Sequence, residues 1–427
     1  MNDTVSRYHP RDAVAPGLRL LDRLGCRALV SRLGGLARGR ITLIDGDGRE
    51  TFGTTGDPLH ATVVVHAPAF YGDAVFGGSI GAAEAYMSGL WSCDDLTTLA
   101  RILIRNRDVL DGMELGLARV SAPLRRFLHR LRRNTRSGSR RNIAAHYDLG
   151  DEFFALFLDE TMMYSCALFE RPDSSLREAS VAKNDLICRK LRLSPDDHLL
   201  EIGTGWGGFA IHAAAQFGCR VTTATISRRQ FDCAARRIRE AGLAGRVTVV
   251  LKDYRDLREL NTRFDKIVSI EMIEAVGHAF YDTNFRCCSD LLKPEGMMLL
   301  QAITIEDHRY ERAKRSVDFI QRYIFPGSCV PSVAALCAAV TRATDMRPFH
   351  LEDIGSHYPP TLRCWRLRLR GNADKILALG FSESFLRMWE LYLCYCEGGF
   401  LERSISNVHM LLTKPLCRLS SDVGQSA

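Results

Sequence analysis

The chain has 427 residues, of which 46% are hydrophobic and 25% charged, and a formal net charge of +7. This composition is that of a globular protein and excludes general disorder, while the length predicts two domains rather than one. No run approaches the roughly 18–20 apolar residues that span a bilayer, and the N-terminus lacks a secretion-signal pattern. We therefore expect a cytoplasmic protein in which most of the 14 scattered cysteines are free and none holds a metal.

Residues 1–122 have the pattern of a small α+β domain. The expected elements are, in chain order, a helix over 16–36, two hairpin strands within 40–53, a strand over 61–68 and a helix over 94–104. The turn Gly46-Asp47-Gly48 joins the hairpin strands, and Ser92 is the expected cap of the last helix.

A basic linker over residues 123–145 follows. Between Arg125 and Arg141 it holds eight arginines and no acidic residue. Such a segment suits an anionic membrane surface or nucleic acid, and it is equally typical of a solvated interdomain linker. This stretch alone does not distinguish a membrane-binding segment, a nucleic-acid-binding segment and a solvated linker.

From residue 146 to residue 427 short apolar strands alternate with helical segments. This alternation predicts an α/β fold with a parallel-rich, doubly wound sheet covered on both faces. Residues of about 304–370 are expected to form an insertion that covers the substrate. Ligands of such sheets bind beyond the carboxyl ends of the strands, and a glycine turn at Gly203 follows the first strand.

The turn "EIGTGWGG" has two interpretations. Gly203, Gly205 and Gly208 match the G-x-G-x-x-G of nicotinamide-binding folds, but no acid ends the second strand to bind ribose. The acid Glu201 and an aliphatic residue before G-x-G are instead typical of S-adenosylmethionine methyltransferases. Asp253, which follows the third strand, is then placed to accept from the adenine amino group.

Several motifs in order make the chain resemble the cyclopropane-fatty-acyl-phospholipid synthase family, which includes the mycolic acid cyclopropane synthases. They are "YSCA" (164–167), "EIGTGWGG" (201–208), "EMIEAVGH" (271–278), "YIFPGSCVPS" (323–332) and "HYPPTL" (357–362). The resemblance covers nearly the whole chain from Ala83 onward. It implies a Rossmann-like class I methyltransferase domain that uses S-adenosyl-L-methionine.

The resemblance also implies which residues hold the cofactor. Carried over by motif, the cofactor-binding positions are Tyr164, Ser165, Gly203, Gly205, Thr225, Gln230, Asp253 and Tyr254. Thr204 stands where the family commonly has cysteine, which matters little because the backbone makes the contact. Thr225 and Gln230 replace the usual ribose-binding acid.

The chemistry implied is the attack of a cis double bond on the sulfonium methyl, followed by loss of a proton and ring closure. In the family the proton acceptor is a bound bicarbonate. By motif its cradle here consists of Cys166, Glu274, the backbone of Ile303, Tyr358 and Gln301. Gln301 stands where many members have a histidine, and Glu271 and Ala275 also depart from the commonest pattern. Aromatic faces such as Tyr358, Tyr323 and Phe325 are expected to stabilise the cation.

The implied substrate is an unsaturated phospholipid in the membrane, and the domain over residues 1–122 is then expected to associate with that lipid or membrane. The Arg125–Arg141 region is then expected to bind the anionic inner membrane surface, which makes the enzyme peripheral, with no nucleic acid bound and a homodimer compatible with the sequence. The glutamine at position 301 leaves open a methyl-branched or methylene product. A non-catalytic lipid- or nucleic-acid-binding protein and a nicotinamide dehydrogenase remain as rivals.

Overall fold

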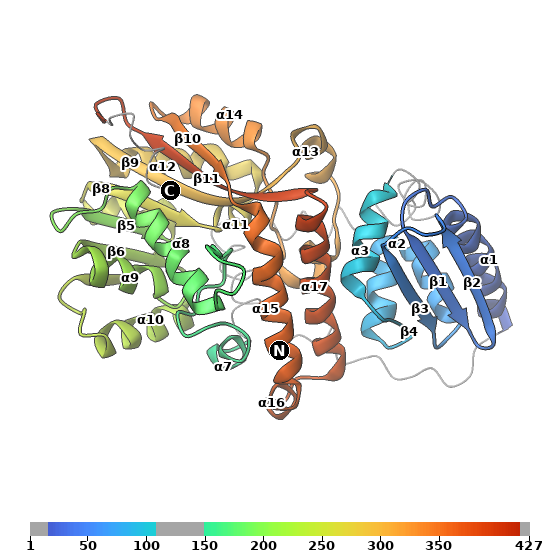
Figure 1. Cartoon of the computed structure of the whole chain (residues 1–427). Helices are drawn as coiled ribbons and strands as arrows, with labels where there is room; N and C mark the ends of the chain where they lie inside the picture. The colour runs from blue at the N-terminus through green and yellow to red at the C-terminus, as the bar shows by residue number, and fades with distance from the viewer. Residues whose placement is uncertain (1–15, 108–148, 419–427) are drawn as a thin grey trace. The chain divides into compact units, whose positions relative to one another are not determined.

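The structure is a computed structural model, and it describes residues 16–107 and 149–418 (Figure 1). The expected basic linker over 123–145, with Arg125–Arg141, lies outside the described residues. The chain divides into two compact units. Ala373–Glu402, which the sequence analysis placed in the catalytic domain, belongs to the unit of the N-terminal residues.

The N-terminal unit contains one small sheet and five helices among its described residues. Its elements are α1 (Pro16–Leu33), β1 (Arg40–Asp45), β2 (Gly48–Gly53), β3 (His60–Val65), α2 (Ala69–Met87), β4 (Trp91–Cys93), α3 (Leu96–Arg105), α16 (Ala373–Ala378) and α17 (Glu383–Leu401). The sheet has the order β2-β1-β3-β4, and β1 and β2 form the expected antiparallel hairpin. The expected cap is wrong: the Asp95 side chain, not Ser92, accepts from the first backbone amides of α3.

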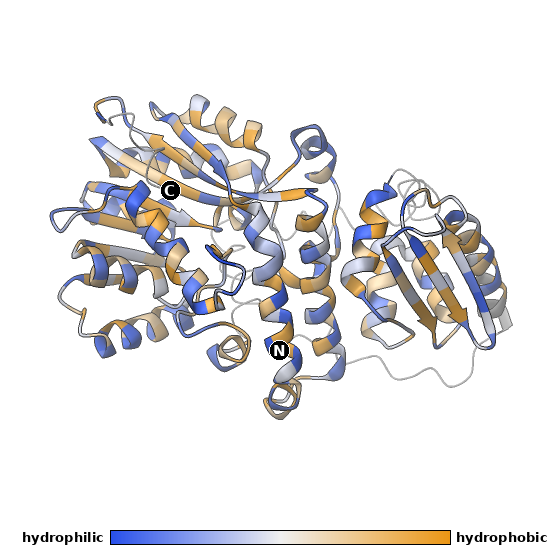
Figure 2. Cartoon of the chain, in the orientation of Figure 1, coloured by the Kyte–Doolittle hydropathy of each residue, from blue (hydrophilic) through white to orange (hydrophobic). Residues whose placement is uncertain are grey.

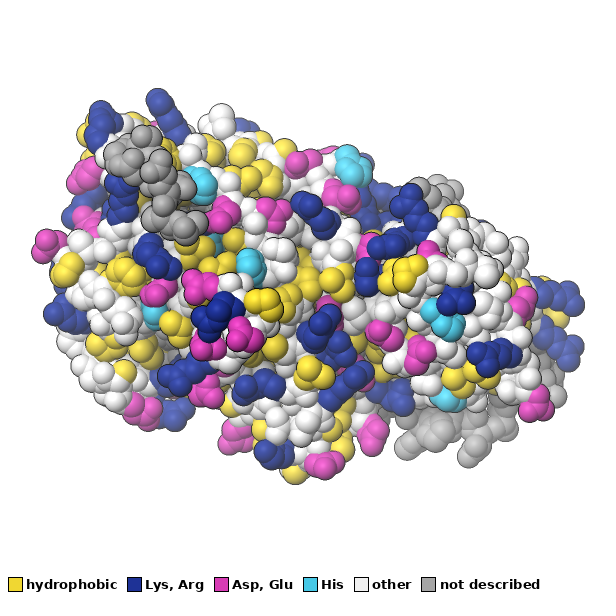
Figure 3. All heavy atoms as spheres, viewed as in Figure 1, with side chains coloured by type: hydrophobic (Ala, Val, Ile, Leu, Met, Phe, Trp, Pro, Cys, Tyr) yellow, Lys and Arg dark blue, Asp and Glu magenta, His cyan; other side chains and the backbone are white. Residues whose placement is uncertain are grey.

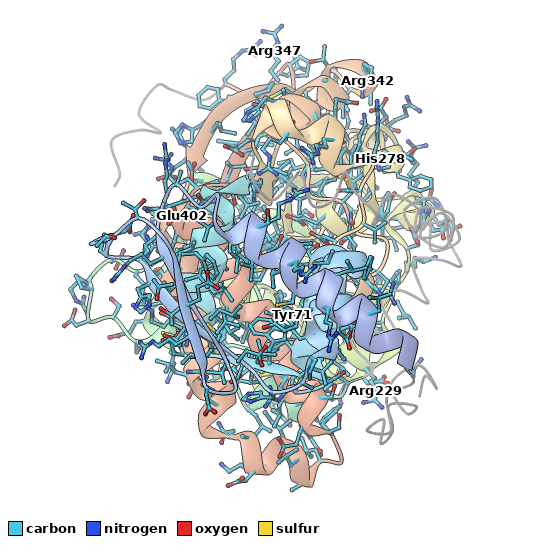
Figure 4. All side chains as sticks on the ribbon, turned by 90° about the vertical axis from the view of Figure 1, so that its right-hand side faces the viewer. Tyr71, Arg229, His278, Arg342, Arg347 and Glu402 are labelled. Carbon is cyan, nitrogen blue, oxygen red and sulfur yellow. The ribbon has the colours of Figure 1, made fainter. Side chains whose placement is uncertain are left out.

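Helix α17 belongs to this unit because its polar side chains bond to residues of α3 and its small residues pack against that helix. The Thr97 hydroxyl donates to Glu397 Oε2 at 3.2 Å. Glu402, labelled in Figure 4, accepts from Arg101 at 2.6 Å and from Arg105 at 2.7 Å. These contacts join residues about 300 positions apart, which is why no local pattern revealed them.

The second unit is built on a seven-stranded sheet. Its strands are β5 (His198–Ile202), β6 (Arg220–Thr225), β7 (Val247–Leu251), β8 (Phe264–Ile270), β9 (Leu292–Ile305), β10 (Arg347–Asp353) and β11 (Ile405–Thr413). The order is β10-β11-β9-β8-β5-β6-β7, with β5 to β9 mutually parallel and β11 antiparallel to both neighbours. Strand β10 lies within the expected insertion over 304–370, so part of that segment is an edge strand of the sheet.

Helices cover both faces of this sheet, as Figure 1 shows. The helical elements are α7 (Asp151–Ala155), α8 (Leu176–Lys190), α9 (Gly208–Phe217), α10 (Arg228–Glu240), η1 (Tyr254–Leu260), α11 (Ile273–Val276), η2 (His278–Phe280), α12 (Tyr281–Leu291), α13 (Asp307–Ala313), η3 (Ile320–Ile324), α14 (Val333–Ala343), η4 (Gly355–His357) and α15 (Tyr358–Gly371). The predicted doubly wound α/β fold is confirmed.

Alternate residues of each strand enter opposite cores. On β9, Met298 and Leu300 pack with α12 and α14, whereas Met297 and Leu299 pack with α8, α9 and α10. Figure 2 accordingly shows hydrophobic residues along β9 and many hydrophilic residues on α10. Strands buried on both faces are near-continuous apolar runs, so a polar residue inside one is conspicuous.

Within residues 16–107 and 149–418, no helix has the length and apolar character that crossing a membrane requires. In the same part of the chain no group of three or more His, Cys, Asp or Glu side chains could hold a metal ion.

We predict that Gly398→Val destabilises the N-terminal unit. A Cβ at this position of α17 would lie 2.9 Å from Ala100 Cβ, and overpacking of this kind costs about 1–3 kcal/mol. Urea unfolding followed by circular dichroism measures the effect. Gly77→Ala, where a Cβ meets nothing within 4 Å, is the matched control and should be neutral or slightly stabilising. Equal stability of Gly398→Val and the wild type would show that α17 does not pack against α3.

Candidate active site

The carboxyl ends of β5, β6, β8 and β9 meet at one edge of the sheet, where ligands of open α/β sheets bind. The glycine turn follows β5, Thr225 ends β6, Glu271 follows β8, and Gln301 and Ile303 lie near the end of β9. The structure thus brings to this edge most of the residues that the sequence analysis selected. Parallel pairing is what makes these ends coincide.

The four glycines of the turn have two different functions. Gly203 (φ +104°) and Gly205 (φ +51°) have left-handed backbones, and a Cβ on Gly205 would meet nothing within 4 Å. A Cβ on Gly207 would instead lie 3.2 Å from Ala234, and one on Gly208 would lie 2.3 Å from the Thr161 carbonyl oxygen. Gly207 and Gly208 therefore serve packing, whereas Gly205 leaves open space that suits the close approach of a cofactor; a Cβ on Gly203 would lie 3.5 Å from Met272.

Two other predicted cofactor positions lie at the neighbouring strand ends. The Thr225 hydroxyl donates to Gln230 Oε1 at 2.8 Å, which joins the end of β6 to the start of α10. Asp253, after β7, is buried, and its carboxylate accepts from the Arg255 guanidinium at 2.6 and 2.7 Å. Arg255 also lies over the Tyr254 ring, and burial raises the pKa of that phenol. Asp253 as the acceptor for adenine stays a prediction.

The "YSCA" loop lies against α8 and α15. Lys183 on α8 is fully buried, and its Nζ donates to the Ser165 hydroxyl at 3.1 Å. Burial lowers the pKa of Lys183 to about 8. The Tyr164 ring packs against Trp365 at 5.2 Å and against Phe154 at 5.5 Å between centroids. This segment therefore presents an aromatic wall next to a buried amine.

Three of the five residues of the predicted cradle, Cys166, Gln301 and Tyr358, hold the carboxylate of Glu271, a half-buried residue. Its Oε1 accepts from the Cys166 backbone N–H at 2.9 Å and from Gln301 Nε2 at 2.8 Å. It also accepts from Asn407 Nδ2 at 2.6 Å. The Tyr358 hydroxyl donates to the other oxygen, Oε2, at 2.6 Å.

The Cys166 side chain is not an anion in this arrangement. Its thiol is fully buried and lies 3.3 Å from the Ala167 carbonyl oxygen. Burial, reinforced by the negative Glu271, raises the pKa of the thiol well above its usual value. Cys166 therefore contributes a backbone donor rather than a nucleophile.

Glu274 and Ile303, the other two residues of the predicted cradle, form a separate pair. The Ile303 backbone N–H donates to Glu274 Oε1 at 2.5 Å. Glu274 Oε2 is buried and has no hydrogen-bond partner among the described residues. Burial and the charge of Glu271 raise the pKa of Glu274 to about 8, so it carries a proton at neutral pH.

The sequence analysis missed three residues of this network. Glu271 was noted only as a departure from the family pattern, and Asn407 and His409 were not selected at all. Both lie on β11, and His409 Nε2 lies 3.1 Å from Gln301 Oε1. Asn407 and His409, two positions apart in a largely apolar strand, were the available signal, because alternate residues share one face.

Bicarbonate does not fit this cradle as the sequence analysis expected. Cys166 has one backbone N–H and Tyr358 one hydroxyl proton, and both are donated to Glu271. A second anion would find these donors engaged and a negative carboxylate in contact with it. The residues present therefore argue against bicarbonate as an occupant of this site.

The sheet order with an antiparallel β11, the open glycine turn and the polar strand ends define a class I S-adenosylmethionine-dependent methyltransferase. The family model of mycolic acid cyclopropane synthetase matches residues 134–410. The chain belongs to this family. A nicotinamide dehydrogenase is thereby no longer a candidate.

Individual relatives agree with this assignment. The tuberculostearic acid methyltransferase UfaA1 of Mycobacterium tuberculosis is 38% identical over 84% of both chains. The cyclopropane-fatty-acyl-phospholipid synthase of Escherichia coli is 37% identical over 81% of this chain and 86% of its own length. Mycolic acid cyclopropane synthase CmaA1 complexed with SAH and CTAB superposes with a TM-score of 0.60 and 32% identity, covering 64% of this chain and 98% of its own.

We predict that Glu274→Gln removes a loss of stability that occurs in the wild type as the pH rises. The pKa of Glu274 is about 8 in the folded state, against 4.5 in the unfolded chain. Between pH 4.5 and pH 8 the unfolded chain loses a proton that the folded state keeps, so the free energy of unfolding falls as the pH rises. The variant cannot ionise and keeps the acceptor for Ile303. Urea unfolding at pH 5 and pH 9 should show the variant gaining at least about 1 kcal/mol on the wild type, the equivalent of one pKa unit. A pH-independent difference would contradict the assignment.

Proposed function

We propose that this protein transfers a one-carbon unit from S-adenosylmethionine to the cis double bond of an unsaturated phospholipid acyl chain and closes a cyclopropane ring. The observation that supports this best is the combination of an open cofactor turn and a held carboxylate at one edge of the sheet. The named activity of the Escherichia coli relative supports the substrate class. A protein that only binds lipid or nucleic acid requires no such carboxylate.

In this proposal each residue has a physical task. S-adenosylmethionine supplies an electrophilic methyl group, and Gly203 and Gly205 bring bare backbone close to it. Tyr164, Ser165, Thr225, Gln230, Asp253 and Tyr254 are the side chains proposed to hold the cofactor. The alkene carbon forms the new bond to the methyl group as the carbon–sulfur bond breaks, which leaves a cation on the other alkene carbon.

Aromatic rings are suited to holding that cation away from water. Tyr358 and Tyr164 both pack against Trp365, and Phe325 lies 6.4 Å from Tyr164 between centroids. Ring faces attract cations by on the order of 1–2 kcal/mol when desolvated. Tyr323, also expected in this role, already has the Arg322 guanidinium over its ring at 5.3 Å. We therefore favour Tyr164, Tyr358 and Phe325.

A second product is supported by one of the relatives. The 38% identical relative is named a tuberculostearic acid methyltransferase, not a cyclopropane synthase. The same cation can take a hydride from the methyl-bearing carbon and then lose a proton from the methyl group, which gives a methylene product. A methyl branch would require a separate reductase to reduce that product. The cofactor turn and the cradle are compatible with both outcomes.

We also propose that the enzyme works at an anionic membrane surface. Figure 3 shows basic and acidic side chains interspersed over the face in view, so this face offers no large patch of one sign. The eight arginines of Arg125–Arg141 are the strongest concentration of charge in the sequence. Each basic residue near an anionic leaflet contributes up to about 1 kcal/mol. A homodimer stays a prediction.

We predict that purified protein moves labelled methyl carbon from S-adenosylmethionine into vesicles of unsaturated phospholipid. Vesicles of saturated phospholipid are the control and should receive no label. NMR of the isolated acyl chains identifies the product, because only a cyclopropane has upfield ring protons. Label without ring protons would favour the second product, and no label in any unsaturated lipid would refute the proposed function.

We predict that attachment to anionic vesicles weakens as salt rises, because mobile ions screen the arginines. Flotation at low and high salt measures this attachment, with neutral vesicles and an RNA gel shift as controls. A variant with the eight arginines of Arg125–Arg141 replaced by glutamine should float at least tenfold less protein. Salt-insensitive flotation, or equal flotation of the variant, would contradict membrane attachment through this region.

A further inference from the structure

The Glu271 carboxylate is held as a bound anion would be held. Four donors point at its two oxygens: the Cys166 backbone, Gln301, Asn407 and Tyr358. Ionised carboxylates are acceptors only, so a site made entirely of donors suits the charged form. Three of the donor groups, Cys166, Gln301 and Asn407, belong to fully buried residues.

The backbone of Glu271 is strained in order to place this side chain. Its φ is +49°, a left-handed conformation that costs a residue with a Cβ about 1–2 kcal/mol and costs glycine almost nothing. The Glu271 N–H donates to the Gln301 carbonyl oxygen at 2.8 Å, which ties the strained residue to β9. A non-glycine residue retained in such a position points to a function.

Glu271 retains capacity for a proton. Oε1 accepts three hydrogen bonds, whereas Oε2 accepts one in the described part of the chain, from Tyr358. Each carboxylate oxygen can accept about two. The neighbouring Glu274 is already protonated at neutral pH, because burial and Glu271 raise its pKa to about 8. Of the two carboxyl groups, Glu271 is therefore the one able to act as a base.

We propose that Glu271 is the chain's own proton acceptor, occupying the position that bicarbonate would take, and that the reaction needs no bicarbonate. This inference rests on the proposed function. Glu271 Oε2 takes a proton from the newly attached methyl group, and the released C–H electron pair forms the bond to the cationic carbon. The resulting carboxylic acid returns its proton to solvent before the next turnover.

The first experiment compares turnover in carbon-dioxide-free buffer with turnover after addition of bicarbonate. The wild type should be equally active in both. Glu271→Gln keeps the size of the side chain and removes the base, so it should lose at least about 100-fold in kcat in both buffers, with unchanged affinity for S-adenosylmethionine. Glu295→Gln, at an exposed position near the start of β9, is the matched control and should behave as the wild type. A wild type that requires bicarbonate, or a fully active Glu271→Gln, would overturn the proposal.

The second experiment empties the cradle. Glu271→Gly removes the carboxylate and suits the left-handed backbone, so the variant should fold, as circular dichroism can verify. Its donors should then bind ¹³C-labelled bicarbonate, seen by NMR line broadening, and its activity should return when bicarbonate is added. The wild type should give no broadening. Broadening by the wild type, or none by the variant, would overturn the proposal.

The NMR measurement uses no lipid substrate and no turnover. It therefore keeps the two proposals separate. If the wild type transfers no label to any lipid yet binding follows the expected pattern, the proposed function fails and Glu271 remains the occupant of the anion site. If transfer occurs but the wild type binds and needs bicarbonate, the function stands and the role of Glu271 fails.

Discussion

The carboxylate of Glu271 and its donors set a constraint on the whole catalytic unit. The four donors lie 105, 30, 136 and 87 residues from Glu271 in the sequence, on a loop, β9, β11 and α15. A carboxylate placed in a partly dry site without them would be costly. The position of each of these elements is therefore coupled to the position of the others.

The donors are themselves oriented by a chain of buried polar groups. The Lys190 ammonium can only donate, so His409 Nδ1, 2.9 Å away, must accept, and the pKa of His409 lies well below its usual value because the ring is buried beside a cation. His409 Nε2 then carries the proton and donates to Gln301 Oε1. This leaves the Gln301 amide N–H groups for Glu271. Lys190, acting through His409, thus determines that the N–H groups of the Gln301 amide, and not its oxygen, point to Glu271.

Structural features that depend on residues close in sequence were predicted from local patterns. Features that depend on pairing between distant residues were not. The strand–glycine–helix unit at Gly203 was predictable because the turn directly follows β5 and its left-handed backbone requires glycine, so the whole signal lies within a few residues. Cys166, Gln301 and Tyr358 were found together because separate motifs carried them. Glu271, the carboxylate that binds all three, was not predicted, because it follows an apolar strand and its role depends on donors from β11. The sequence analysis placed residues 373–402, with α17, in the catalytic domain for the same reason: their place in the N-terminal unit depends on pairs such as Thr97 with Glu397.

The two departures from the family pattern, Glu271 and Gln301, are physically consistent with each other. A histidine at position 301 would lie in contact with a permanent carboxylate, which favours the protonated imidazolium. That cation would lower the basicity of Glu271 and weaken it as a proton acceptor. A glutamine donates a hydrogen bond without titrating, so it orients the carboxylate without placing a positive charge beside it. A base that is part of the chain also needs no binding step before each turnover, and a strain of about 1–2 kcal/mol at one residue is a small cost for that.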